Sequence, residues 1–236
     1  MKLYNPLLTL KKREWALWLI SLFSVVLSNI LTGEFVWSTA LGSIIGVTAL
    51  IFIAKGDVWG QILTVLFSIL YGVTSYRFRY YGEMITYLGM TMPSAVMSVI
   101  SWIKNPYEKA EKTNEVKISK LSKFKIVIMI ILTVLVTQIF YYILKYFDTP
   151  NLFFSTVSVL TSFLASYLMI LRNSYYAVAY AFNDIVLVIL WIMATSKDFS
   201  YLPMVICFIM FFINDIYGFL SWKKREKRQS EKYFKT

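Results

Sequence analysis

The feature that most constrains this chain is a series of apolar stretches, each about twenty residues long, that recur along nearly its whole length. Of the 236 residues, 58% are hydrophobic and 16% are charged, whereas soluble domains carry about 25% charged residues. Since an α-helix rises about 1.5 Å per residue, about 20 residues cross the hydrocarbon core of a bilayer. The sequence therefore predicts an all-α polytopic membrane protein with no soluble domain of ordinary size.

The apolar stretches predict eight transmembrane helices, joined mostly by short turns. The basic lead-in to the first stretch is followed by no small-residue cleavage site, so we expect a retained helix rather than a signal peptide. The predicted helices are Trp15–Leu31, Phe35–Ala54, Val58–Tyr76, Met84–Trp102, Phe124–Lys145, Leu152–Leu171, Tyr175–Thr195 and Tyr201–Trp222.

The basic residues determine the expected orientation. With the N-terminus inside, 20 of the 24 Lys and Arg residues fall in inner segments, and Arg77, Arg79, Lys145 and Lys197 fall outside. This split follows the positive-inside rule, so we expect a multi-pass protein of the cell (plasma) membrane with both termini cytoplasmic. The net charge of +11 is attributed to orientation and to attraction to anionic lipid, and no nucleic-acid partner is predicted.

A polar segment from Lys104 to Lys123 divides the chain near its middle. On each side lies a set of three predicted helices, and the two sets close on matching sequences, "SWIK" at 101–104 and "SWKK" at 221–224. We interpret the sets as parallel repeats, which in transporters place the substrate near mid-depth where the repeats meet; chance self-similarity is the alternative. The predicted organisation is an N-terminal basic segment with an extra helix (1–34), a first three-helix repeat (35–103), a cytoplasmic linker with a connector helix (104–146), a second three-helix repeat (147–222) and a basic cytoplasmic tail (223–236).

Two aspartates interrupt apolar runs, in "FND" at 182–184 and in "FFINDIYGF" at 211–219. Of the 13 acidic residues, Asp184 and Asp215 are the two that fall deep in predicted helices. An ionised carboxylate at the centre of a membrane helix costs about 2.5–3.5 kcal/mol, so each is expected to face a cavity, a partner or a ligand. The candidate substrate-binding residues are Asn183, Asp184, Trp191, Asn214, Asp215, Tyr217, Gln61 and Tyr87.

The chemistry of this cluster suits a nucleoside, because carboxylates and amides bind sugar hydroxyls while aromatic rings stack on a base. Trp191 and Trp222 each follow an aspartate by seven residues, which places them on nearly the same helix face. Two plainer interpretations stay open. The aspartates and their neighbouring asparagines hold helices together by hydrogen bonds, and the two tryptophans belong to aromatic belts at the membrane surface. For Gln61 and Gln138 two roles stay open: they line the substrate path, or they join helices by hydrogen bonds.

Enzyme chemistry finds little support in the sequence. The chain has no His and a single Cys, so it offers neither a clustered His/Cys metal site nor an intrachain disulfide, and it has no G-x-S-x-G motif or glycine-rich phosphate loop. A membrane protease dyad of Asp184 and Asp215 is disfavoured, because each lies in an N-D-I setting without small flexible neighbours. We expect no enzyme activity, no metal and no cofactor.

The stretch "YYGEMITYLGMTMPSAVMSVISWIK" resembles the signature of the PnuC family of vitamin and nucleoside transporters. "GQILTVLFSILYGVTSY" and "NDIYGFLSWKK" are similar to it as well, and the resemblance covers residues 35–224. It implies a SWEET-like homotrimer that lets nicotinamide riboside equilibrate across the membrane without ion coupling, before an intracellular kinase traps it by phosphorylation. The matching residues of the signature are Tyr81, Gly82, Glu83, Pro93 and Trp102.

Two departures from the family pattern bear on the substrate. Nicotinamide riboside members carry a Trp-x-x-Trp pair in the helix that here reads "FNDIVLVILW", where Trp191 is the one tryptophan. Ser94 and Ala95 stand where the family tends to place a glutamine shortly after the mid-helix proline. The expected substrate is nicotinamide riboside or a deoxynucleoside. Thiamine or riboflavin is a further alternative, as is a role as the substrate-binding subunit of an ATP-driven importer.

Overall fold

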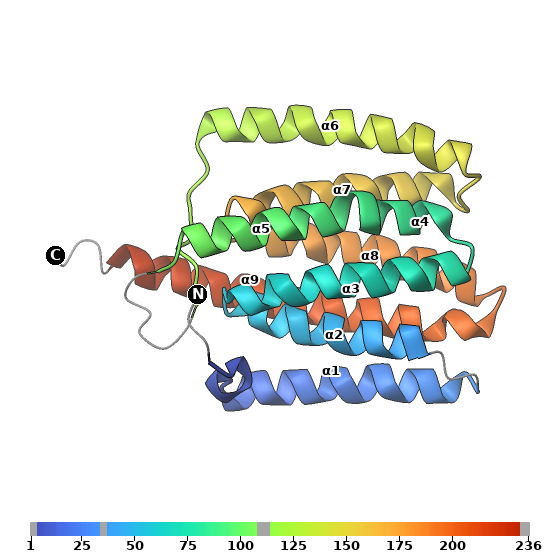
Figure 1. Cartoon of the computed structure of the whole chain (residues 1–236), viewed down its shortest axis with the longest axis horizontal. Coiled ribbons are helices and arrows are strands. Elements are labelled where there is room, and N and C mark those ends of the chain that lie inside the picture. The colour runs from blue at the N-terminus through green and yellow to red at the C-terminus, as the bar shows by residue number, and fades with distance from the viewer. Residues whose placement is uncertain (1–3, 34–36, 108–113, 232–236) are drawn as a thin grey trace.

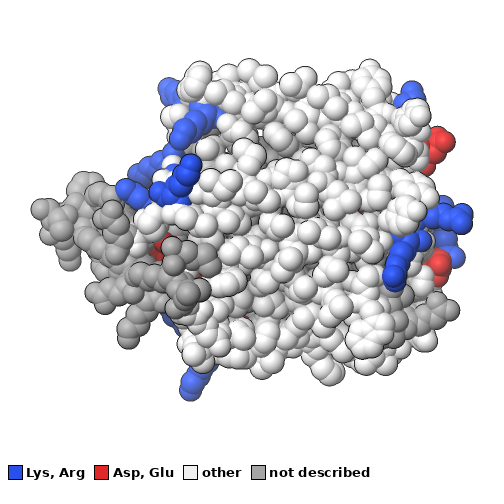
Figure 2. Space-filling model, viewed as in Figure 1, with Lys and Arg blue, Asp and Glu red and all other residues white. Residues whose placement is uncertain are grey.

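The computed structural model describes residues 4–33, 37–107 and 114–231, and in these ranges it consists of helices and connections with two isolated β-bridges. Among the described residues, eight helical spans are long and apolar enough to cross a membrane. The spans run side by side along the long axis of the molecule (Figure 1). Charged side chains gather at the two ends, and the broad middle of the visible face carries none (Figure 2). The prediction of an all-α membrane protein with eight crossings is confirmed.

Nine α-helices make up these spans, and short 3-10 turns at Pro6–Thr9 and Phe199–Tyr201 precede the first and last of them. The helices are α1 (Lys12–Leu31), α2 (Trp37–Ala54), α3 (Val58–Arg77), α4 (Tyr81–Thr86), α5 (Met92–Lys104), α6 (Lys123–Tyr146), α7 (Leu152–Ile170), α8 (Tyr176–Thr195) and α9 (Leu202–Glu231).

The fourth span is not the uninterrupted helix that the sequence predicts from Met84 to Trp102. A π-helical turn, Tyr87–Thr91, joins α4 to α5. Pro93 lies two residues after the end of this turn, and a proline ring clashes with the carbonyl four residues earlier, so the helix widens there. The wider turn shows in the hydrogen bond from the Met92 N–H to the Tyr87 carbonyl, five residues back.

The last helix is longer than predicted, because α9 continues nine residues beyond Trp222 into the segment interpreted as a basic tail. Glu115 of the linker forms ion pairs with Arg225 (2.7 Å) and Arg228, and the Gln229 side chain donates to the Glu115 carboxylate (3.0 Å). These contacts hold the basic helix end against the linker. The rest of the predicted tail, 232–236, and the linker residues 108–113 lie outside the described residues.

Six spans form a closed ring. The order of contacts is α2, α3 and α5, then α7, α8 and α9, with α9 returning to α2. α1 lies outside the ring against α2 and α9, and α6 lies outside it against α7 (Figure 1). In the sequence, the ring consists of two sets of three spans with α6 between them. The interpretation of these sets as parallel repeats joined by a connector stays a prediction.

Buried aromatic clusters fill both ends of the ring. Towards one end, the rings of Tyr71, Tyr80 and Tyr201 lie against Trp191. Towards the other, Trp222 contacts Trp102 and Tyr176. The space between the two clusters lies near the middle of the spans.

Candidate functional site

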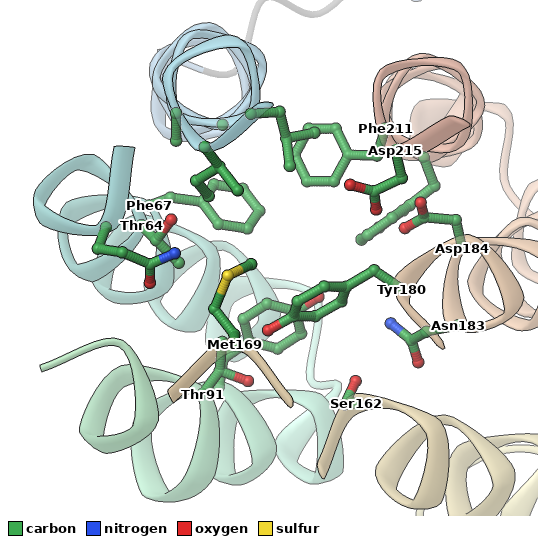
Figure 3. Close-up of a pocket in the computed structure, with 17 residues that line it drawn as sticks. Thr64, Phe67, Thr91, Ser162, Met169, Tyr180, Asn183, Asp184, Phe211 and Asp215 are labelled. Atoms are coloured by element: carbon green, nitrogen blue, oxygen red, sulfur yellow. The ribbon is translucent and has the colours of Figure 1, made fainter. Parts of the chain in front are cut away.

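A cavity occupies the centre of the helix ring, and all six spans of the ring contribute to its wall. Polar side chains lie on two sides of the cavity, with aromatic and aliphatic side chains between them (Figure 3). The polar lining residues are Gln61, Thr64, Thr91, Ser162, Asn183, Asp184 and Asp215, and the aromatic ones are Phe67, Tyr87, Tyr180, Phe208 and Phe211.

Asp184 of α8 and Asp215 of α9 form the acidic side of the cavity. Each side chain is 3% exposed, and the two carboxyl groups point towards each other within hydrogen-bonding reach (Figure 3). Asp184 Oδ2 is buried and has no hydrogen-bond partner in the described structure. A buried polar atom without a partner is costly in a low-dielectric interior. The acid pair therefore has spare capacity to accept hydrogen bonds from a ligand.

Asn183 adds a donor beside the acid pair. The hydroxyls of Ser158 (3.2 Å) and Thr161 (2.9 Å), both on α7, donate to Asn183 Oδ1. An amide oxygen only accepts and an amide nitrogen only donates, so these two bonds fix the orientation of the group. Its nitrogen points towards the cavity (Figure 3).

The side of the cavity away from the acids is polar but uncharged. Thr64 of α3 and Thr91 of the π turn lie there (Figure 3), and Gln61 belongs to the same wall. Gln61 is 2% exposed, and its Nε2 has no hydrogen-bond partner. The Met169 and Tyr180 side chains reach into the space between the two sides (Figure 3).

Aromatic rings form the rest of the wall. Phe67 of α3 and Phe211 of α9 meet with ring centroids 5.3 Å apart, so they bring the two sets of helices together beside the cavity. Gly46 of α2 makes this possible, because a Cβ at that position would lie 2.5 Å from a ring carbon of Phe211. Flat apolar surface next to carboxylate and amide groups is the combination that a nucleoside requires.

The structure brings five of the eight predicted site residues to the cavity, namely Gln61, Tyr87, Asn183, Asp184 and Asp215. Gln138, which was expected either to line a path or to join helices, is exposed on α6 and does not line the cavity. Tyr87 reaches the cavity because the π turn carries it there. Trp191, Asn214 and Tyr217 do not line the cavity, which corrects their assignment.

The two tryptophans occupy neither of the places considered for them. Trp191 and Trp222 are both 0% exposed, so they are not belt residues facing lipid, and neither lines the cavity. The Trp191 indole donates to the Tyr71 hydroxyl (3.2 Å) in the aromatic cluster at one end of the ring. The Trp222 indole donates to the Ile53 carbonyl (2.7 Å) near the other end.

Asn214 and Tyr217 face the extra helix α1 instead. Asn214 Nδ2 donates to Ser21 Oγ (3.0 Å), and the Tyr217 hydroxyl donates to Glu14 Oε1 (3.0 Å). Neighbouring residues on a helix differ by about 100° in direction, so Asn214 points away from the cavity that Asp215 lines. The plainer interpretation, that these polar residues hold helices together by hydrogen bonds, applies to the two asparagines, although their partners lie on α7 and α1 rather than on the aspartates.

Several lining residues were not predicted. Tyr180 precedes Asp184 by four residues, and Phe211 precedes Asp215 by four, so helical periodicity in the N-terminal direction would have found both. Glu14 (2% exposed) and Glu83 (1% exposed) are buried as well, although both lie in the first turn of their helices. Thr64, Thr91 and Ser162 carry no signal in the sequence, because a lone hydroxyl in an apolar helix is ordinary.

Comparison with known proteins agrees with this architecture. The model of the nicotinamide mononucleotide transporter family matches residues 36–224. The chain is similar to a protein of Neisseria mucosa described as the nicotinamide riboside transporter PnuC, with 25% identity over 217 residues, 91% of this chain and 82% of the relative. It is also similar to the crystal structure of the vitamin B3 transporter PnuC, with a TM-score of 0.81, 24% identity, and coverage of 93% of this chain and 94% of the other. The chain therefore belongs to the nicotinamide mononucleotide transporter family, the family of the PnuC proteins.

Proposed function

We propose that this protein mediates facilitated uptake of a nucleoside-like substrate, nicotinamide riboside or a deoxynucleoside. The observation that carries the proposal is the cavity at the centre of the six-span ring, with an acid pair on one side and aromatic rings beside it. Such a cavity can hold both parts of a nucleoside, because carboxylates accept hydrogen bonds from sugar hydroxyls and aromatic rings contact the face of a base.

The relatives support this choice of substrate. The Neisseria mucosa protein is described as a nicotinamide riboside transporter. The acid pair would balance the positive charge of the nicotinamide ring, which favours nicotinamide riboside. The cavity wall, however, contains no tryptophan, and Phe and Tyr are weaker cation–π partners than Trp. This observation favours a neutral deoxynucleoside as the second candidate.

Transport in this proposal is passive. The chain contains no His to exchange protons near neutral pH, and the acid pair is needed for the ligand. Net uptake would come from an intracellular kinase that phosphorylates the substrate and prevents its return. The protein would act as a homotrimer in the plasma membrane with cytoplasmic termini, as the family resemblance and the charge distribution imply.

Movement of the substrate requires each end of the ring to open in turn. Buried aromatic side chains fill the ring on both sides of the cavity, with Trp191 at one end and Trp222 at the other. Rocking of the two three-helix sets against each other would open one end while the other stays closed, as in other transporters built from repeats.

Uptake into liposomes by the purified chain tests the proposal. Labelled nicotinamide riboside and labelled thymidine should enter to the outside concentration and no further, with the same result under an imposed pH or sodium gradient. A suitable nucleoside kinase enclosed in the liposomes should then raise the internal label above that level. Accumulation without the kinase would contradict passive transport. Uptake of thiamine or riboflavin alone would favour the vitamin alternative, and no uptake without an added ATPase would favour the importer subunit.

A further inference from the structure

A second, much smaller hollow adjoins the central cavity where α3, α5, α7 and α8 meet. The two spaces share five lining residues, including Gln61 and Thr64, so they are neighbours with a common wall. We call the smaller hollow the side pouch. Its other lining residues are small, namely Ser94, Ala95 and Ser98 of α5 and Ser166 of α7. These small side chains leave the space that a larger residue would fill.

Most residues that line the side pouch carry a polar group, and none of them is charged. The Gln61 side chain supplies a donor, since its Nε2 is buried without a partner. Thr64 Oγ1 already donates to the Gly60 carbonyl (2.9 Å), which leaves its oxygen free to accept. The hydroxyls of Ser166 and Tyr180 are paired at 2.9 Å. The pouch therefore suits a neutral group that has both a donor and an acceptor.

The pouch and the acid pair lie on different sides of the cavity. Asp184 and Asp215 are on one side and Thr64 and Thr91, which also line the pouch, are on the other (Figure 3). A ligand that spans the cavity must then have two different polar ends. One end must donate hydrogen bonds to carboxylates, and the other must present a neutral amide-like edge.

We propose that the side pouch is the subsite for the polar edge of the substrate's base, and that Gln61 recognises this edge by hydrogen bonds. The inference rests on the proposed function, and it places the sugar hydroxyls at Asp184 and Asp215. The carboxamide of nicotinamide and the N–H and C=O edge of thymine share one donor and one acceptor side by side. A glutamine side chain offers the complementary pair, so Gln61 recognises either base by the same chemistry.

Binding measurements with pairs of ligands test this assignment. The first pair is nicotinamide riboside and N-ribosylpyridinium, which lacks only the carboxamide. The second pair is thymidine and 3-methylthymidine, in which the base donor is blocked. Wild-type protein should prefer the first member of the pair that it binds. In Gln61→Leu, affinity for that member should fall about tenfold, while affinity for the second member should change less than about twofold.

Filling the pouch provides an independent variant. Ala95 is 4% exposed and lines the pouch, so Ala95→Leu should remove the same preference without touching Gln61. Matched controls carry the same new residue on lipid-facing positions. Gln138→Leu on α6 and Val96→Leu, next to Ala95 on α5, are at exposed positions and should keep the wild-type preference. The thermal unfolding midpoint of each variant checks that it is folded.

Three outcomes decide the matter. A loss of preference in Gln61→Leu and Ala95→Leu, with Asp215→Asn weakening both members of a pair equally, supports the assignment. Equal weakening of both members by Gln61→Leu, or a loss of preference in Asp215→Asn, overturns it while leaving the proposed function intact. Failure of wild-type protein to bind any nucleoside overturns the proposed function itself, and the subsite assignment with it.

Discussion

The indole rings of Trp102 and Trp222 lie against each other, with ring centroids 5.5 Å apart. Each indole N–H donates to a main-chain carbonyl of the opposite three-helix set. Trp102, at the end of α5, bonds to Met169 of α7 (3.1 Å), and Trp222 of α9 bonds to Ile53 of α2 (2.7 Å). The two hydrogen bonds are reciprocal: α5 of the first set bonds to the end of α7, and α9 of the second set bonds to the end of α2. They close the ring at both contacts between the sets.

The first prediction concerns these two hydrogen bonds. Trp102→Phe and Trp222→Phe keep an aromatic ring in the buried cluster but remove one hydrogen bond and part of the packed surface. Each variant should lose about 1–3 kcal/mol of stability, since a buried indole hydrogen bond and packed surface are lost while each carbonyl keeps a main-chain N–H donor. The thermal unfolding midpoint in detergent measures the loss. Trp37→Phe, at a position 70% exposed, serves as the control, and an equal shift in that control would contradict the prediction.

The fold was largely predictable because hydrophobic length is a local property of the sequence. The eight spans follow from runs of about twenty apolar residues, and the ends Ala54 and Thr195 are as predicted. Two features do not follow from hydrophobic length. The π turn accompanies Pro93, whose local effect on the helix an apolar run does not show. The extension of α9 depends on a distant contact, because Glu115 lies 110 residues before its partner Arg225.

The site was predictable where a residue is chemically out of place. Asp184 and Asp215 stood out because a carboxylate in an apolar helix is costly. Trp191 does not line the cavity with Asp184. A separation of seven residues keeps the two side chains on the same helix face, but it also places Trp191 about 10.5 Å further along the helix, beyond the cavity. Tyr180, one turn from Asp184 in the other direction, reaches the cavity. Periodicity thus gives the face of a helix, and depth comes from the structure.

The second prediction concerns the acid pair. Asp215→Ala should abolish uptake while the protein still inserts and folds, because a carboxyl that lines a cavity contacts ligand and contributes little to assembly. Uptake into liposomes and the thermal midpoint separate these two effects. Asp198→Ala, which changes an exposed aspartate in the turn before α9, is the control. Unaltered transport by Asp215→Ala would remove Asp215 from the site.

At Asp184, the type of substitution distinguishes hydrogen bonding from charge. Asp184→Asn keeps an acceptor and adds a donor, whereas Asp184→Leu removes both. If ligand hydroxyls are the partners, Asp184→Asn should retain measurable uptake and Asp184→Leu should not. Equal loss in the two variants would show that the negative charge itself is required, and would favour a cationic substrate.

The third prediction concerns the attachment of α1. Glu14 forms a buried ion pair with Lys55 (3.2 Å) and accepts from the Tyr217 hydroxyl. Glu14→Leu leaves the Lys55 ammonium without its partner, and breaking a buried pair from one side costs about 3–5 kcal/mol. The double variant Glu14→Leu/Lys55→Met should recover part of that stability in thermal unfolding. Tyr217→Phe should leave the substrate Kd within about twofold, and a larger change would return Tyr217 to the binding site.

The fourth prediction is a pH dependence of stability that arises at Asp57, in the connection before α3. Burial raises the pKa of Asp57 to about 6, and the charge of Glu115 adds to this effect, while the Trp59 N–H and Arg225 oppose it. The Oδ1 atom caps α3 through the Trp59 N–H (3.1 Å), and Oδ2 has no partner. In the unfolded chain the same carboxyl has a pKa near 3.8. At pH values between about 3.8 and 6, the Asp57 carboxyl is therefore protonated in the folded state and ionised in the unfolded chain.

Stability should consequently fall as the pH rises through about 4 to 6 and stay lower above that window. Asp57→Asn keeps a good capping residue and removes the ionisation. The variant should be more stable than the wild type at pH 7.5 by up to about 3 kcal/mol, since each pKa unit corresponds to about 1.4 kcal/mol. The difference should vanish near pH 4. Unfolding midpoints of both proteins across this pH range provide the measurement, and a wild-type advantage at pH 7.5 would contradict it.

The fifth prediction concerns the choice between a cationic and a neutral nucleoside. The tryptophan nearest the acids in sequence, Trp191, is buried against Tyr71 outside the cavity, so the base meets Phe and Tyr rings. A cation–π contact contributes about 0.5–2 kcal/mol and is strongest with Trp. If the base edge lies in the uncharged side pouch, the positive ring also stands away from Asp184 and Asp215. Thymidine should then compete with nicotinamide riboside within about a hundredfold in affinity. A competition assay with purified protein measures the ratio. A preference for nicotinamide riboside above that factor, about 2.7 kcal/mol, would mean that the acid pair contacts the cationic ring rather than the sugar.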